Sequence, residues 1–115
     1  MSSERYKWTK LKNHPITVIE LDGEIDSDKK TEDIEKIAAG EKAEHVALIM
    51  ENVTYINSKG CGQLAAIHKT VEDRGFHLYL VKASPSVTSV IKCLGIDNIL
   101  RLMGGIDEVI REVES

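Results

Sequence analysis

Short apolar runs of strand length alternate along this chain with segments whose apolar residues recur at helical spacing. Residues 45–50 (HVALIM) form one such run, as expected of a central strand covered on both faces. The segment that follows places four apolar side chains along one side of a helix that ends at Gly75: Cys61, Leu64, Ile67 and Val71. Strands that alternate with helices predict an α/β fold with a largely parallel sheet and right-handed crossovers.

Turn signals and helix caps delimit the elements of the N-terminal part. An edge strand is expected at residues 5–11, and a second strand (ITVIEL) begins after Pro15 and stops at the Asp22-Gly23 turn signal. A helix opens near Ser27, a good N-cap, and closes at Gly40. The two leading strands make the sheet mixed at one edge.

The C-terminal part continues the alternation. A strand is expected at residues 77–81 (HLYLV), and Ser84 then caps a helix with Pro85 at its first position. The i, i+3, i+4, i+7 pattern of that helix comprises Val87, Val90, Ile91 and Leu94. A short strand at residues 99–103 leads through Gly104-Gly105 to a last helix. The predicted order is β-β-α-β-α-β-α-β-α, with about four helices.

Composition and charge narrow the function classes. At 115 residues, with 42% hydrophobic and 30% charged residues, we expect one domain spanning residues 1–115. The net charge of −4 and the lack of a basic stripe with interleaved aromatics argue against a nucleic-acid partner. We find no apolar stretch long enough for a signal peptide or a membrane-spanning helix, so a cytoplasmic protein is expected. Cys61 and Cys93 are then expected to be reduced, largely buried thiols.

The residues around Ser58 fit no familiar catalytic motif. The segment NSKGCG lacks the spacing of a P-loop, the third glycine of a dinucleotide fingerprint and the G-x-S-x-G of hydrolases. The four histidines (His14, His45, His68 and His77) are scattered, without metal-ligand spacing and without an acid that the sequence would pair with them. We therefore expect no catalytic residue, metal or cofactor. Cys61 lies near a helix start, but a core-facing thiol is the simpler interpretation.

A serine at a helix start remains as the feature to explain. Either Ser58 or Asn57 is the N-cap, accepting a hydrogen bond from an amide group of the first turn. Helix N-termini favour anions, and Lys59 adds a positive charge beside the hydroxyl. This local chemistry suits a phosphorylation target better than a catalyst.

Three segments together resemble STAS domains of the anti-sigma factor antagonist type. Residues 46–64 (VALIMENVTYINSKGCGQL) are similar to the family's strand, connection, Asp-Ser-Ser/Thr-Gly motif and helix. Gly23-Glu24-Ile25-Asp26 resembles a G-x-[IL]-D turn that precedes this motif in the family. The family's later helical segment resembles the following residues of this chain: Ser84-Pro85-Ser86-Val87, Ile91, Leu94-Gly95-Ile96 and Ile99. The resemblance covers nearly the whole chain and implies the STAS fold, whose element order is the one predicted above.

The resemblance also implies a regulatory mechanism. In the family, a kinase that doubles as an anti-sigma factor phosphorylates the motif serine, and only the unphosphorylated form binds that partner. Carried over, the serine is Ser58, Gly60 is the motif glycine, and a phosphatase is a further expected partner. The expected partner surface surrounds this turn, on a protein that is monomeric when alone: Asp26, Asn57, Ser58, Lys59, Gly60 and Gln63.

Three residues depart from the family pattern. Asn57 replaces the leading Asp, Lys59 replaces the second Ser/Thr, and Ile49 stands where the strand often carries Asp. The first two changes turn the charge of the triplet around Ser58 from −1 to +1. If the Asp helps the kinase to position the hydroxyl, Asn57 slows or prevents phosphorylation. These departures favour one alternative, a STAS subunit of a transporter or other complex that works without phosphorylation. A third possibility from another class is a small enzyme that uses Cys61 or Ser58.

Overall fold

Five strands form one mixed sheet in the order β1-β2-β3-β4-β5. The structure is a computed structural model that describes residues 6–11, 13–25 and 44–114. Its first strand is antiparallel to the second, and the others continue the sheet in parallel: β1 (Tyr6–Lys10), β2 (Ile16–Ile25), β3 (His45–Ile56), β4 (Leu78–Val81) and β5 (Arg101–Met103). The predicted mixed, largely parallel sheet is thus confirmed. Asp26 and the helix expected between Ser27 and Gly40 lie outside the described residues.

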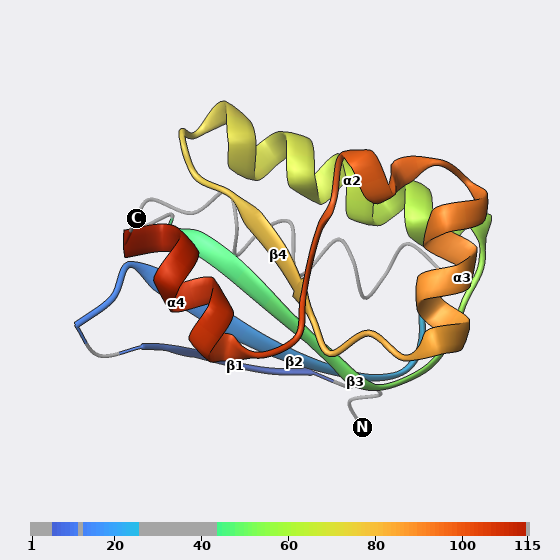
Figure 1. Cartoon of the computed structure of the whole chain (residues 1–115), viewed down its shortest axis with the longest axis horizontal. Helices are drawn as coiled ribbons and strands as arrows, with labels where there is room; N and C mark the ends of the chain where they lie inside the picture. Colours follow the sequence, from blue (N-terminus) through green and yellow to red (C-terminus); the bar gives the residue numbers. More distant parts are fainter. Residues whose placement is uncertain (1–5, 12, 26–43, 115) are drawn as a thin grey trace, which may run out of the picture.

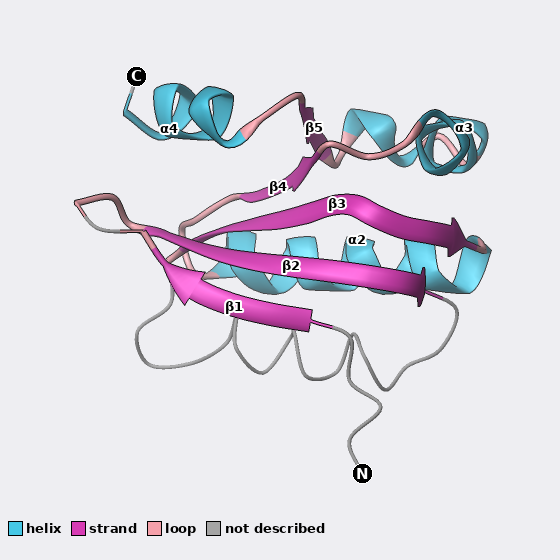
Figure 2. Ribbon diagram, turned by 90° about the horizontal axis from the view of Figure 1, so that it is seen from below, coloured by secondary structure: helices cyan, strands magenta, loops and turns pink. Residues whose placement is uncertain are grey.

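Helices cover both faces of the sheet (Figures 1 and 2). The described part holds three α-helices and a short 3-10 turn: α2 (Ser58–Asp73), α3 (Pro85–Cys93), η1 (Ile96–Asn98) and α4 (Ile106–Glu114). α2 and α3 share one apolar cluster with β2, β3 and β4, whereas α4 packs in a second cluster on the opposite face. In both views α3 stands at the same end of the molecule as the start of α2.

The central strand β3 has apolar neighbours on both faces over its first half. Val46, Leu48 and Met50 belong to the cluster under α2 and α3, and the alternate residues Ala47 and Ile49 belong to the α4 side. This confirms the doubly covered strand predicted at residues 45–50. The apolar stripe of α2 is confirmed as well, because Cys61, Leu64, Ile67 and Val71 are all buried.

Two strands are longer than the sequence predicted. β2 does not stop at Asp22-Gly23 but continues to Ile25, with irregular register on both sides of this pair and Gly23 at a φ of 75°. β3 likewise runs six residues beyond Met50, to Ile56. The glycine absorbs a bulge in the ladder, and pairing between the two strands therefore resumes, with Ile25 opposite Ile56. As a result, both strands end next to the start of α2.

The C-terminal elements follow the predicted order, with two differences in extent. The strand predicted at residues 99–103 begins only at Arg101, after the 3-10 turn Ile96–Asn98, and the buried stripe of α3 ends before Leu94. Ser84 is the N-cap, since its Oγ accepts a hydrogen bond of 3.3 Å from the amide of Val87. Leu94, predicted on the buried stripe, is exposed because the helix ends at Cys93 and Leu94 is its C-cap. None of the described helices is long and apolar enough to cross a membrane.

Candidate functional site

The turn between β3 and α2 is organised by the side chain of Asn57. Its Oδ1 accepts a hydrogen bond of 2.8 Å from the amide of Gly60, and its backbone carbonyl accepts one of 2.9 Å from the amide of Cys61. Asn57 has an extended backbone (φ −116°, ψ −178°) and is the N-cap, so Ser58 is the first helical residue. The choice between Asn57 and Ser58 as the cap is thereby settled, and the Ser58 hydroxyl is not needed for capping.

Gly60 brings the first turn of α2 into direct contact with the end of β2. A Cβ at this position would overlap the backbone carbonyl oxygen of Ile25 and would lie 3.0 Å from Cγ1 of Ile56. No side chain fits in that space, so the glycine permits the close backbone packing expected at this position. The last residues of β2, the last residue of β3 and the start of α2 therefore meet at one point.

The polar residues that follow the Asn57 cap are accessible to solvent. Ser58 and Lys59 are exposed, and Gln63 is partly exposed on the following turn. Tyr55, two residues before the cap, leaves 48% of its surface exposed. Five of the six residues predicted for partner binding lie between positions 57 and 63, although Gly60 among them is buried. Asp26 lies outside the described residues. The sequence reasoning missed Tyr55, because the strand was predicted only over residues 45–50, whereas β3 continues to Ile56.

The two cysteines differ. Cys61 has only 1% of its surface exposed, and burial raises the pKa of its thiol, which disfavours the reactive thiolate. Cys93 is exposed, so the prediction that it is buried was wrong. The buried side chains of α3 are Val87 and Ile91, and a residue two positions after Ile91 falls on the opposite side of a helix. That geometry was available from the sequence.

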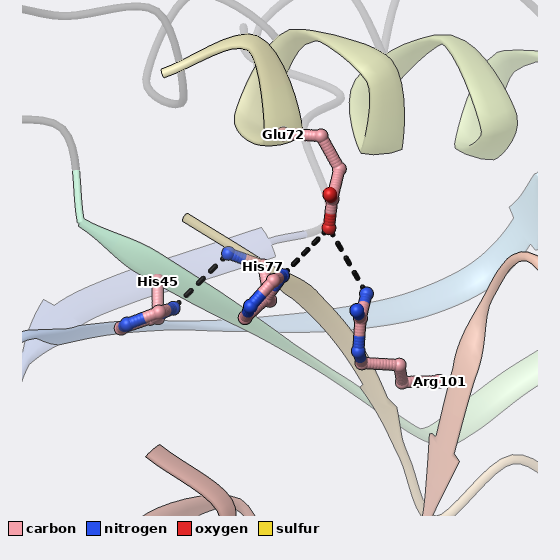
Figure 3. A network of polar contacts seen from close by, with 4 residues as sticks. All are labelled: His45, Glu72, His77 and Arg101. Atoms are coloured by element: carbon pink, nitrogen blue, oxygen red, sulfur yellow. Dashed lines mark hydrogen bonds and ion pairs between the residues drawn. The ribbon is translucent and has the colours of Figure 1, made fainter. Parts of the chain in front are cut away.

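Two histidines, one glutamate and one arginine come together at the other end of α2 (Figure 3). Nδ1 of His77 lies 2.6 Å from Oε2 of Glu72, and Nη1 of Arg101 donates to the same oxygen at 3.0 Å. Nothing in the sequence provided a means of pairing a histidine with an acid. The structure also places Nδ1 of His14 at 2.9 Å from Oε2 of Glu114. No group of three potential metal ligands occurs among the residues that the structure describes.

The comparisons with known proteins agree with this fold. The model of the STAS domain family matches residues 7–113. A crystal structure of a candidate anti-sigma factor antagonist from Thermotoga maritima has a TM-score of 0.79 and 18% identity, covering 96% of this chain and 95% of that one. The unphosphorylated anti-sigma factor antagonist SpoIIAA of Bacillus has a TM-score of 0.70 and 21% identity, covering 96% and 98%.

A transporter relative shares the same architecture. A sulfate transporter family protein from Wolinella succinogenes has a TM-score of 0.77 and 19% identity, covering 91% of this chain and 89% of that one. At such identities the likeness concerns the fold. No curated protein matches the chain.

Proposed function

The chain belongs to the STAS domain family, and we propose that it is a regulatory binding protein of the anti-sigma factor antagonist kind. In this proposal, residues 1–115 act as one cytoplasmic domain, monomeric when alone and without catalytic activity of its own. It binds a serine kinase that doubles as an anti-sigma factor. Phosphorylation of Ser58 releases that partner, and a phosphatase restores binding.

The observation that carries the proposal is the position of Ser58. Ser58 is an exposed residue at the first position of α2, and the side-chain cap of that helix is Asn57 rather than Ser58. A kinase can therefore reach the hydroxyl without unfolding the turn. SpoIIAA, which shares this fold, has been solved both without and with its phosphate.

Electrostatics explain why the phosphate releases the partner rather than unfolding the domain. A phosphoserine carries about −1.5 to −2 charges at neutral pH. The positive end of the helix dipole at the start of α2 stabilises such an anion by about 0.3–1 kcal/mol, and Lys59 next to it adds a positive charge. A partner packed over Ser58 would have to remove the water around the same phosphate, which costs far more.

The departure at Asn57 leaves the local geometry of the motif in place. An asparagine and an aspartate side chain cap a helix through the same oxygen position, and Asn57 does so at 2.8 Å. In the sequence, Asn57 removes the negative charge that the family's aspartate would place next to the serine. The proposal therefore depends on a kinase that recognises the turn by its shape and by Lys59 rather than by an acidic residue.

Intact mass spectrometry after incubation with ATP and the anti-sigma factor kinases of the same organism tests the modification. The expected result is one added phosphate on the wild type and none on Ser58→Ala. Ser89→Ala is the matched control, because Ser89 is an exposed helical serine on α3. Phosphate that persists in Ser58→Ala would refute Ser58 as the site.

Partner binding is tested separately from modification. Ser58→Asp and Lys59→Glu should weaken binding of the kinase partner, whereas Ser58→Ala should retain it. Glu112→Lys on α4, whose apolar side packs on the opposite face of the sheet, is the control and should bind as the wild type does. Equal losses from Lys59→Glu and Glu112→Lys would contradict the proposed surface.

A second candidate function is a STAS subunit of a transporter complex that uses the same surface without phosphorylation. Two observations favour it: the transporter relative of the same fold, and the replacement of the acidic motif residue by Asn57. The mass measurement separates the two functions. If the wild type stays unmodified but Asn57→Asp accepts a phosphate, the motif no longer works as a kinase site, and the transporter-type function is the better proposal.

A further inference from the structure

The start of β3 is joined to the start of β4 through a histidine ring. Nδ1 of His45 accepts a hydrogen bond of 3.0 Å from the backbone amide of His77, the residue just before β4 (Figure 3). A ring nitrogen accepts only when it carries no proton, so His45 must be neutral, with its proton on Nε2. A second proton would have to go to Nδ1, where the amide hydrogen already points.

The side chain of His77 continues the connection to α2 and β5. Its Nδ1 contacts Oε2 of Glu72, one residue before the end of α2, and the same oxygen accepts from Arg101, the first residue of β5. These four side chains, His45, Glu72, His77 and Arg101, form what we call the histidine latch. It joins the last turn of α2 to three neighbouring strands.

The surroundings of His45 disfavour its charged form. Two basic groups face it, His77, whose ring stacks at 5.5 Å, and Arg101, while Glu44 and Glu72 favour the charge. The rings of Phe76 and Tyr79 lie at 5.1 Å and 6.4 Å. Burial, followed by the two basic groups, lowers the pKa of His45 below its ordinary 6.5 despite the two carboxylates.

We propose that the histidine latch is an acid-sensitive fastening between α2 and the starts of β3 and β4, opened when Nδ1 of His45 takes a proton from solvent. The added proton removes the acceptor for the His77 amide and creates a cation, which His77 and Arg101 disfavour electrostatically. The partly buried amide then lacks its partner in the protein, which favours separation of the two strand starts. The Glu72–Arg101 ion pair keeps its charges at that point, so the opening is local. The latch is independent of any role for Ser58.

NMR on the full chain tests the proposal without any substitution. Over a titration from about pH 8 to about pH 5, the His45 ring should titrate with a midpoint below 6.5, and the His77 amide signal should shift with the same midpoint. Hydrogen exchange of the His77 amide, corrected for its intrinsic pH dependence, should accelerate several-fold on the acid side. The proposal would be overturned if the His45 ring titrated with a midpoint at or above pH 6.5. It would also be overturned if the His77 amide signal did not shift over the pH range.

His45→Asn supplies the matched variant, because the Asn oxygen stands near the position of Nδ1 and accepts the same hydrogen bond without titrating. It should keep the His77 amide protected across the pH range. His14→Asn is the control, since His14 is also paired with a glutamate but lies outside the latch, and it should respond to acid as the wild type does. If hydrogen exchange of the His77 amide still accelerated in acid in His45→Asn, His45 would not be the responsive group.

Discussion

The α-carbon of Gly60 lies directly against the backbone carbonyl oxygen of Ile25, with no room for a Cβ between them. The first turn of α2 therefore rests on the last residue of β2. Since Ser58 belongs to that turn, the position of the proposed phosphorylation site depends on one glycine and on the extension of β2 beyond Gly23.

Replacement of Gly60 by alanine should destabilise the domain. The added methyl group would overlap the Ile25 carbonyl oxygen and press on Ile56, and the backbone has to move to relieve this. Overpacking of this kind typically costs about 1–3 kcal/mol. Urea unfolding should show a lower free energy of unfolding for Gly60→Ala.

Gly62→Ala is the control for that measurement. Within the described part of the chain, nothing lies within 4 Å of a Cβ at position 62, and the residue is exposed inside α2. Alanine favours a helix interior over glycine by about 0.5–1 kcal/mol, so Gly62→Ala should be as stable as the wild type or more stable. If Gly60→Ala were as stable as Gly62→Ala, the close contact between Gly60 and Ile25 would be absent.

Loss of the Asn57 cap should be measurable in the same way. Asn57→Ala removes the acceptor for the Gly60 amide and should lower the free energy of unfolding by about 1 kcal/mol. Asn57→Asp keeps the acceptor and should be at least as stable as the wild type, because a carboxylate also favours the helix start. Ser58→Ala should change stability by less than about 0.5 kcal/mol, since the exposed hydroxyl does not cap α2. Equal losses for Ala at positions 57 and 58 would contradict this assignment.

The two thiols should react at very different rates in the folded protein. Cys93 is exposed, whereas Cys61 is buried in the core with a raised thiol pKa. A thiol reagent at neutral pH should modify one cysteine quickly, and Cys93→Ser should abolish that fast phase. In urea both cysteines should react. Fast labelling of Cys61 in the native state would instead revive the enzyme alternative.

Stability should fall as the pH decreases from neutral. Burial lowers the pKa of His45 and of His68 below 6.5 in the folded state, so the unfolded chain binds these protons more readily. The two neutral histidines contribute fully to stability above pH 6.5. This contribution is lost as the pH falls through their pKa values in the folded state. The hydrogen bond from His77 lowers the pKa of Glu72, whose contribution is complete above its ordinary 4.5 and is lost below it. Both effects have the same sign.

Urea midpoints between about pH 7.5 and about pH 4 measure this dependence. The double variant His45→Asn, His68→Asn should lose less stability than the wild type over the upper part of the range, where the histidines titrate. The lower part, where Glu72 takes up a proton, should be unchanged. A wild-type midpoint that is flat or rises towards acid pH would contradict the lowered pKa values.

Local features of the sequence were sufficient for most of the fold and part of the candidate site. The alternation of apolar runs and helical stripes predicted the order of the described elements, because burial selects a period of two in strands and about 3.6 in helices. The caps at Asn57 and Ser84 were also within reach, since a cap bonds an amide only three residues ahead. The exposure of Cys93 was accessible by the same spacing, although it was predicted wrongly.

The tertiary structure alone decided the features that depend on partners distant in the sequence. β2 and β3 extend past Gly23 and Met50 because each continues to pair with the other, and a glycine with a positive φ allows the bulge. The latch brings residues 45, 72, 77 and 101 together because β3, β4 and β5 are parallel. Their first residues therefore lie side by side, next to the end of α2. The sequence by itself determined which segments become strands and helices, since that follows from short-range periodicity. Strand pairing determined how far those strands run and which polar groups meet, since hydrogen bonds across a sheet join residues that no local pattern connects.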